Sequence, residues 1–291
     1  MFKFLKIAAI ALCLIANLLT TDAAGADLKL PQEVVFVPKK ILLGTLELET
    51  TIFKPEGPGP FPLVVINHGK APGSPGLQAR YIPGWAARYF LERNYIVMVP
   101  MRSGFSKSTG NYIGGGCNVE SNGQAQAEDV AATVAYAHTL PDVDKEVTLI
   151  IGQSHGGWTT LAYGASNPDP SVRGLVNFAG GLKQTDCLGW DLNLASAAGN
   201  YADKTKVPSL WFYGDNDSFF SRTVSDNMFK HYHAAQPNSA FVAFGAFKQD
   251  AHSLFGHKDG RAIWEPHLEQ FLKQLGLPTA VVNPQYKPTS E

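Results

Sequence analysis

Hydrophobic and polar positions alternate in long blocks from about residue 30 onward. Short runs rich in β-branched and aromatic residues predict strands at 34–37, 41–53, 63–66, 95–99, 147–151, 174–178, 209–213 and 241–244. Apolar residues at helical spacing predict helices at 85–93, 125–139, directly after 154, 219–235 and 262–275. Because strands and helices alternate from residue 63 onward, we expect an α/β fold with a mainly parallel sheet and helices on both faces.

Two stretches interrupt this alternation. Residues 102–123 are rich in Gly and Ser, and residues 180–206 include Trp190 and Tyr201. We expect both stretches to be irregular and to form short cap loops at the carboxyl ends of strands, where open α/β sheets bind their ligands. Residues 278–291 contain three prolines and predict a poorly ordered tail.

The amino-terminal segment has the layout of a secretory signal peptide. Lys3 and Lys6 precede an apolar run at 7–19, and small residues follow up to Ala26. We therefore predict a signal peptide over residues 1–26 and a periplasmic or secreted protein. An uncleaved anchor is the alternative, but the run is shorter than the roughly 20 residues that a spanning helix needs. After cleavage we expect no stable membrane association.

Composition and charge narrow the class of protein. The chain has 291 residues, of which 45% are hydrophobic and 17% charged, and this balance is typical of a globular protein with a sizeable core. The formal net charge is −1, and Lys and Arg form no cluster. A polyanion-binding surface is therefore not expected, and nucleic acid is excluded as a predicted partner.

The number of cysteines indicates whether the mature chain contains a disulfide. Cys13 falls within the predicted leader, so the mature chain would keep Cys117 and Cys187. An even pair in an oxidising compartment favours one disulfide, and two buried free thiols are the alternative. Neither cysteine has a second ligand at C-x-x-C spacing, so no metal site is predicted.

Gly152-Gln153-Ser154-His155-Gly156 is the most informative motif of the chain. It follows the apolar run at 147–151 and precedes a helical segment, so it predicts a strand, a sharp turn and a helix. The two glycines permit the close packing that such a turn requires, and the turn presents the serine hydroxyl above the strand ends. The alternative is that Ser154 only caps the helix. The motif predicts acyl transfer through Ser154.

A serine nucleophile needs a histidine base and a carboxylate that orients the base. In this arrangement the acid and then the histidine follow the serine along the chain. Asp217 lies just beyond the strand at 209–213, and we prefer it to Asp215, which is still within the turn. His252 follows the strand at 241–244 and is the predicted base, with His257 as the alternative.

The oxyanion of the reaction needs two N–H donors, one after the nucleophile and one from the loop after an earlier strand. The main-chain N–H groups of His155 and Lys70 fit these two places, since Lys70 lies in the loop at 67–73. The Lys70 side chain offers a positive charge to anionic substrates, and a solvated lysine is the alternative. His68 precedes Ser154 and is expected to brace the loop.

These motifs together resemble the α/β-hydrolase superfamily, and they are most similar to its dienelactone-hydrolase and prolyl-oligopeptidase-like branch. The resemblance runs from about residue 34 to 275 and rests on the motifs at 67–69, 100–106, 152–157, 213–217 and 251–252. It implies an α/β-hydrolase domain over residues 27–277 that hydrolyses esters, lactones or peptide-like acyl bonds without metal or cofactor. Dienelactone hydrolases resemble this pattern with cysteine at the position of Ser154, and this departure argues against lactone specificity.

We expect a serine hydrolase that acts on short-acyl carboxylic esters of small molecules. The excursion at 180–206 is short for a lipase-like lid and is mostly polar, which argues against a deep fatty-acyl tunnel. A peptidase or acyl-peptide hydrolase is the first alternative, although no Glu-Glu pair that would bind a substrate amine is found. Acyl transfer to an alcohol uses the same triad. A non-catalytic binding protein on this fold would normally lack a triad residue.

Overall fold

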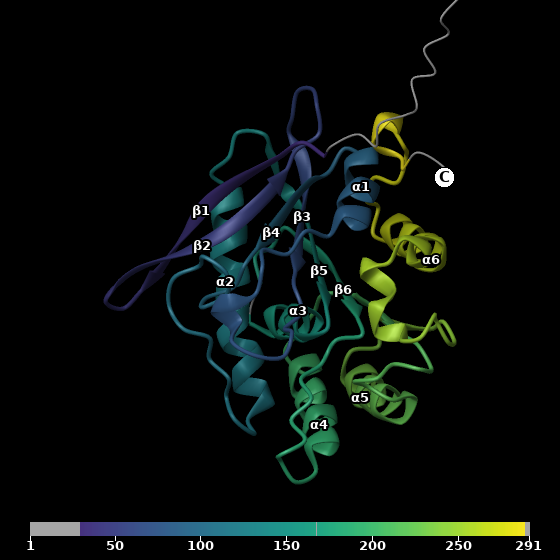
Figure 1. The fold of residues 1–291 in the computed structure, drawn as a ribbon. Coiled ribbons are helices and arrows are strands. Elements are labelled where there is room, and N and C mark those ends of the chain that lie inside the picture. Colours follow the sequence, from purple (N-terminus) through teal and green to yellow (C-terminus); the bar gives the residue numbers. More distant parts are fainter. Residues whose placement is uncertain (1–29, 167, 289–291) are drawn as a thin grey trace, which may run out of the picture.

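A computed structural model describes residues 30–166 and 168–288, and the predicted signal peptide lies outside them. The strands of this part of the chain form one eight-stranded sheet in the order β1-β2-β4-β3-β5-β6-β7-β8 (Figure 1). The strands are β1 (Gln32–Ile41), β2 (Gly44–Phe53), β3 (Phe61–Asn67), β4 (Ile96–Pro100), β5 (Val143–Gln153), β6 (Val172–Phe178), β7 (Ser209–Tyr213) and β8 (Ser239–Ala243). β1 and β2 form an antiparallel hairpin, β2 runs antiparallel to β4, and the other pairs are parallel.

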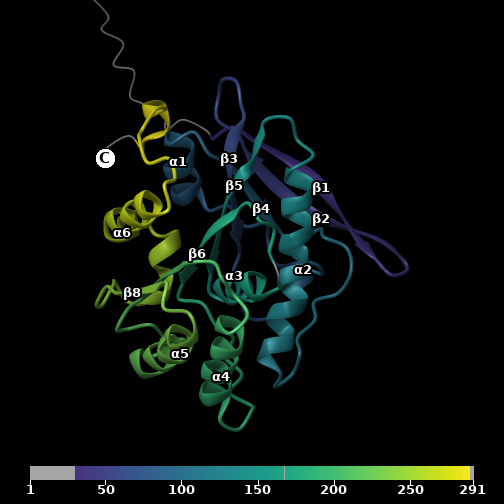
Figure 2. The ribbon, with the colours of Figure 1, turned by 180° about the vertical axis from the view of Figure 1, so that it is seen from behind.

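Helices cover both faces of the sheet, as the alternation predicts. They are α1 (Gly84–Glu92), α2 (Val119–Ala137), α3 (His155–Ala165), α4 (Trp190–Ala202), α5 (Arg222–Ala235) and α6 (Arg261–Gln274). Figures 1 and 2 show α1 and α6 on one side of the sheet and α2 on the other. Side chains of β3 alternate between the two cores, since Leu63 and Val65 belong to the core that includes side chains of α2 and α3, whereas Val64 and Ile66 belong to the core that includes side chains of α1 and α6.

The two stretches expected to be irregular contain helical segments. α2 begins at Val119, because the Asn118 side chain caps it by accepting a hydrogen bond from the Ser121 amide at 2.9 Å. α4 lies within residues 180–206 and buries Leu194, Ala198 and Tyr201, which are spaced for one helical face. The composition of these stretches concealed the short helical patterns within them.

The carboxyl-terminal segment packs on the end of α1, so the expectation of a poorly ordered tail is wrong for residues 278–288. The amides of Val282 and Asn283 both donate to the Glu92 carbonyl, at 2.9 and 3.0 Å. Tyr286, in a short 3-10 turn, is only 1% exposed. The tail thus satisfies carbonyl groups that a helix end leaves without partners.

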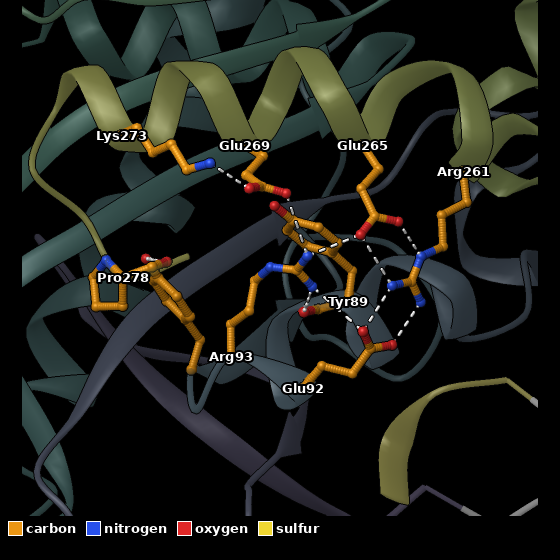
Figure 3. A network of polar contacts seen from close by, with 9 residues as sticks. Tyr89, Glu92, Arg93, Arg261, Glu265, Glu269, Lys273 and Pro278 are labelled. Atoms are coloured by element: carbon orange, nitrogen blue, oxygen red, sulfur yellow. Dashed lines mark hydrogen bonds and ion pairs between the residues drawn. The ribbon is translucent and has the colours of Figure 1, made fainter. Parts of the chain in front are cut away.

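An ion-pair network joins α1 to α6 (Figure 3). Glu92 is fully buried, and its two carboxylate oxygens accept hydrogen bonds from Arg261 at 2.6 and 2.7 Å. Arg93 lies over the Tyr89 ring and donates to Glu265 at 2.8 Å. The network fixes the helix layer on the α1 face of the sheet. No helix in the described ranges is long and apolar enough to cross a membrane.

Candidate active site

Ser154 occupies a sharp turn between β5 and α3. Its backbone angles are φ 57° and ψ −126°, a conformation that costs a non-glycine residue about 1–3 kcal/mol. Hydrogen bonds hold the turn, because the Ser154 amide donates to Phe178 and its carbonyl accepts from Trp158 and Gly181. A Cβ atom at Gly152 would lie 2.0 Å from the Gly156 carbonyl oxygen, so only glycine fits there.

The structure brings Asp217 and His252 together. Nδ1 of His252 lies 3.0 Å from Oδ2 of Asp217, whose side chain is fully buried. The other carboxylate oxygen of Asp217 accepts from the amides of Phe219 and Phe220 at 2.8 and 2.9 Å. These amides fix the carboxylate, which in turn fixes the imidazole with Nδ1–H toward Asp217 and leaves Nε2 free to act as a base.

The two alternative residues lie in other contacts. Asp215 forms an exposed ion pair with Arg222 at 3.2 Å, as expected for an acid of the turn itself. His257 accepts a hydrogen bond from the Asp259 amide through Nδ1, at 3.1 Å. Neither of them forms a hydrogen bond or an ion pair with His252 in the described structure. The geometry therefore favours Asp217 and His252 as the pair beside Ser154.

The loop after β3 lies directly against the Ser154 turn. A Cβ atom at Gly69 would come within 3.2 Å of the Ser154 Cβ atom. Lys70 follows Gly69 in this loop and lines both cavities at Ser154, and His155 follows Ser154 at the start of α3. Neither main-chain amide donates a hydrogen bond to another described residue. Two such free N–H groups are what an oxyanion requires.

Two buried histidines, His68 and His155, lie in the same two segments as these amides. Nε2 of His68 accepts from the Arg102 amide at 3.1 Å, so its Nδ1 carries the proton and donates to the Gly69 carbonyl at 2.6 Å. Nδ1 of His155 lies 3.0 Å from Nη2 of Arg102, and its Nε2–H donates to Oδ1 of Asn122 at 2.8 Å. Burial, and then the charge of Arg102, lower the pKa of both rings well below the usual range, so both are neutral.

Ser154 opens onto two cavities. The larger, about 500 Å³, is lined by His252, Tyr81, Met101 and neighbouring residues. The smaller, about 310 Å³, is lined by Tyr112, Leu182, Phe220 and the loop segments around them. Lys70 and Phe219 border both cavities, and Lys183 borders the smaller one. No group of His, Cys, Asp and Glu able to hold a metal ion occurs within residues 30–166 and 168–288.

The predicted disulfide is present and ties the wall of the smaller cavity. Cys117 and Cys187 are bonded, with Cα atoms 5.7 Å apart. Beside the bridge, Gln184 donates to the Gly116 carbonyl at 3.0 Å and Asn193 to the Cys117 carbonyl at 2.6 Å. The bridge thus joins the two loops that leave the sheet after β4 and β6.

Sequence reasoning assigned no role to three residues of the site. Gln153 donates from Nε2 to the His252 carbonyl at 3.1 Å, and the Phe219 ring packs 4.4 Å from the imidazole. Arg102 is fully buried below the loop after β3. Their contacts join segments that are far apart in the sequence, so only the folded chain reveals them.

Comparison with known families agrees with this geometry. Residues 92–274, more than half of the chain, match the dienelactone hydrolase family. The chain belongs to this family. It is therefore a hydrolase, and membership implies a small-molecule substrate. No curated protein sequence gives a significant match.

Several solved structures share the fold. An esterase of Pyrococcus furiosus is 14% identical, with a TM-score of 0.62 over 85% of this chain and 91% of the esterase. An acylaminoacyl peptidase of Pyrococcus horikoshii is 18% identical, with a TM-score of 0.63 over 87% of this chain and 43% of the peptidase. Dipeptidyl peptidase 4 of Porphyromonas gingivalis is 20% identical, with a TM-score of 0.62 over 84% and 35%. The chain spans less than half of either peptidase, and the shared architecture confirms the predicted α/β-hydrolase fold.

Proposed function

We propose that the protein is a serine hydrolase that cleaves short-acyl carboxylic esters through an acyl-enzyme on Ser154. The Asp217–His252 pair carries this proposal, because its imidazole lines the same cavity as a serine in a strained turn. A serine hydroxyl is too weakly acidic to attack an ester at neutral pH without such a base. A buried carboxylate on Nδ1 fixes the tautomer that leaves Nε2 able to accept the proton.

In the proposed reaction, Oγ of Ser154 attacks the ester carbonyl carbon while His252 takes its proton. The amides of Lys70 and His155 donate to the carbonyl oxygen as it becomes negative. The tetrahedral intermediate then collapses, and the alcohol leaves with the proton from His252. Water, deprotonated by His252, attacks the acyl-enzyme and releases the carboxylic acid.

The two cavities suggest how the ester lies. His252 must protonate the leaving alcohol, and it lines only the larger of the two cavities. We assign the alcohol to that cavity and the acyl group to the smaller one. A volume of about 310 Å³ lies at the lower end of small-ligand sites, and this supports a short acyl group.

The charges around Ser154 support an ester rather than an aminopeptidase substrate. No Asp or Glu lines either cavity in the described chain, whereas Lys70 and Lys183 border the smaller one. A free substrate amine would therefore meet like charge instead of a carboxylate. We also propose that the protein is exported to the periplasm or the medium, supported by the amino-terminal leader and the disulfide.

A fluorophosphonate probe tests this function directly. The purified mature chain and its Ser154→Ala variant are labelled, the modified peptide is mapped by mass, and turnover of p-nitrophenyl esters from acetate to palmitate is measured. We expect labelling at Ser154 only, with the highest kcat/KM for short chains. A preference for palmitate would overturn the acyl-length assignment, and faster cleavage of acyl-aminoacyl anilides would favour a peptidase. Folded protein that shows neither labelling nor turnover would favour a non-catalytic binding protein on this fold.

A further inference from the structure

Arg102 is a buried cation without an ion pair. It lies two residues beyond the end of β4, its exposed fraction is 0%, and no carboxylate of the described residues forms an ion pair with it. Its Nε and Nη1 atoms donate no hydrogen bond to those residues. Asp129 acts on it through space, but its carboxylate is already bonded to Lys39 and Ser103.

An arginine with a purely structural role looks different in the same molecule. Arg93 is 3% exposed, yet it pairs with Glu92 and Glu265 at 3.3 and 2.8 Å. Burial lowers the pKa of Arg102 to about 10, and the opposing effect of Asp129 does not cancel it. Keeping an unpaired charge buried is costly for folding, and such groups concentrate at functional sites.

The contacts of Arg102 lead to both amides that flank Ser154. Its main-chain N–H donates to Nε2 of His68, two residues before Lys70. Its Nη2 donates to Nδ1 of His155, whose own main-chain N–H is the other donor. A 3.4 Å approach of the same Nη2 to Nδ1 of His68 is a contact only, because that nitrogen carries a proton. One residue therefore spans the two segments of the oxyanion site.

We propose that Arg102 is a positioning residue that holds the Lys70 and His155 amides in place and whose charge favours the anionic tetrahedral intermediate. The inference rests on the proposed function and extends it to the electrostatics below the oxyanion site. The buried guanidinium lies 5.4 Å from the centroid of the Phe105 ring but has no carboxylate ion pair in the resting protein. The oxyanion supplies negative charge above it during the reaction. Preorganised charge of this kind acts on the transition state more than on the bound substrate.

The test compares Arg102→Met and Arg102→Lys with Arg93→Met, a matched variant of a buried arginine outside the site. Active enzyme is counted by fluorophosphonate titration, and kcat and KM are measured on p-nitrophenyl acetate. The Ki of a short alkylboronic acid, which forms a tetrahedral anion on serine, is measured beside them.

For Arg102→Met we expect kcat to fall about 10- to 100-fold while KM changes less than about threefold. The Ki of the boronic acid should rise in proportion to the loss of kcat. Arg102→Lys keeps the positive charge but loses the planar guanidinium that reaches His155. Its kcat and boronic acid affinity should therefore lie between those of the wild type and Arg102→Met. Arg93→Met should unfold at a lower temperature with unchanged kcat.

A folded Arg102→Met variant with wild-type kcat and boronic acid affinity would overturn the inference. So would a loss in which KM rises and kcat stays constant, since that indicates weaker substrate binding alone. If Arg102→Met does not fold, Arg102→Lys decides, because wild-type kcat and Ki in that variant would exclude positioning through His155. An inactive and unlabelled wild type would instead refute the proposed function itself.

Discussion

Replacing Arg261 with Met tests how strongly the α1–α6 network stabilises the fold. Glu92 is fully buried and receives both of its short hydrogen bonds from Arg261, so the variant leaves a buried carboxylate without its main partner. Breaking a buried pair in this way costs about 3–5 kcal/mol. Arg93 remains 3.3 Å from Glu92 and partly compensates, which places the expected loss near 3 kcal/mol. For a domain of this size that loss lowers Tm by about 6–12 °C.

Thermal unfolding followed by circular dichroism and calorimetry measures this effect. Lys273→Met is the control, because it removes an exposed pair with Glu269 and should cost less than about 0.5 kcal/mol. The double variant Glu92→Leu with Arg261→Met removes both partners and should recover part of the loss. The reasoning is refuted if Arg261→Met unfolds at the wild-type temperature, or if the double variant is less stable than the single one.

Three further predictions follow from the site and the network. Asp217→Asn should lower kcat on p-nitrophenyl acetate about 10⁴-fold and Asp215→Asn less than about threefold; equal losses would exclude the proposed acid. Lys183→Gln should lower kcat/KM for p-nitrophenyl hemisuccinate against the butyrate about threefold at low salt, and an unchanged ratio would show that Lys183 does not act on the acyl group. Burial raises the pKa of Glu265, but Arg261 and Arg93 outweigh it and hold that pKa below its usual value of 4.5. The unfolded chain therefore binds this proton more readily than the folded chain does. The contribution of Glu265 to the free energy of unfolding is complete above about pH 4.5 and is lost as the pH falls through the pKa of the folded state. Glu265→Gln should flatten this acid limb in denaturant titrations, and an unchanged limb would contradict the assignment.

The sheet and most of its helices were predictable because their signals are local. The alternation of apolar runs and amphipathic segments gave the mainly parallel sheet with helices on both faces, and the strand-turn-helix pattern placed Ser154 at a turn after β5. α4 was missed because its buried face consists mainly of alanines, which give a weaker apolar pattern than large side chains. The packed tail was missed because its partner is the end of α1, nearly two hundred residues away in the sequence.

Residues that orient the candidate site were harder to predict from the sequence than the residues proposed to perform the chemistry. Ser154, Asp217 and His252 each follow a strand end, so an α/β topology brings them to one edge of the sheet. Gln153 is the last residue of β5 and Arg102 lies two residues beyond β4, but the sequence does not say what they bind. Gln153 tethers the His252 loop by its carbonyl, and Arg102 joins the loop after β3 to the start of α3. Each of these contacts joins segments at the ends of two strands. A change in strand register would therefore displace the base and the oxyanion donors together. The edge of the sheet is in this sense part of the catalytic geometry that we propose.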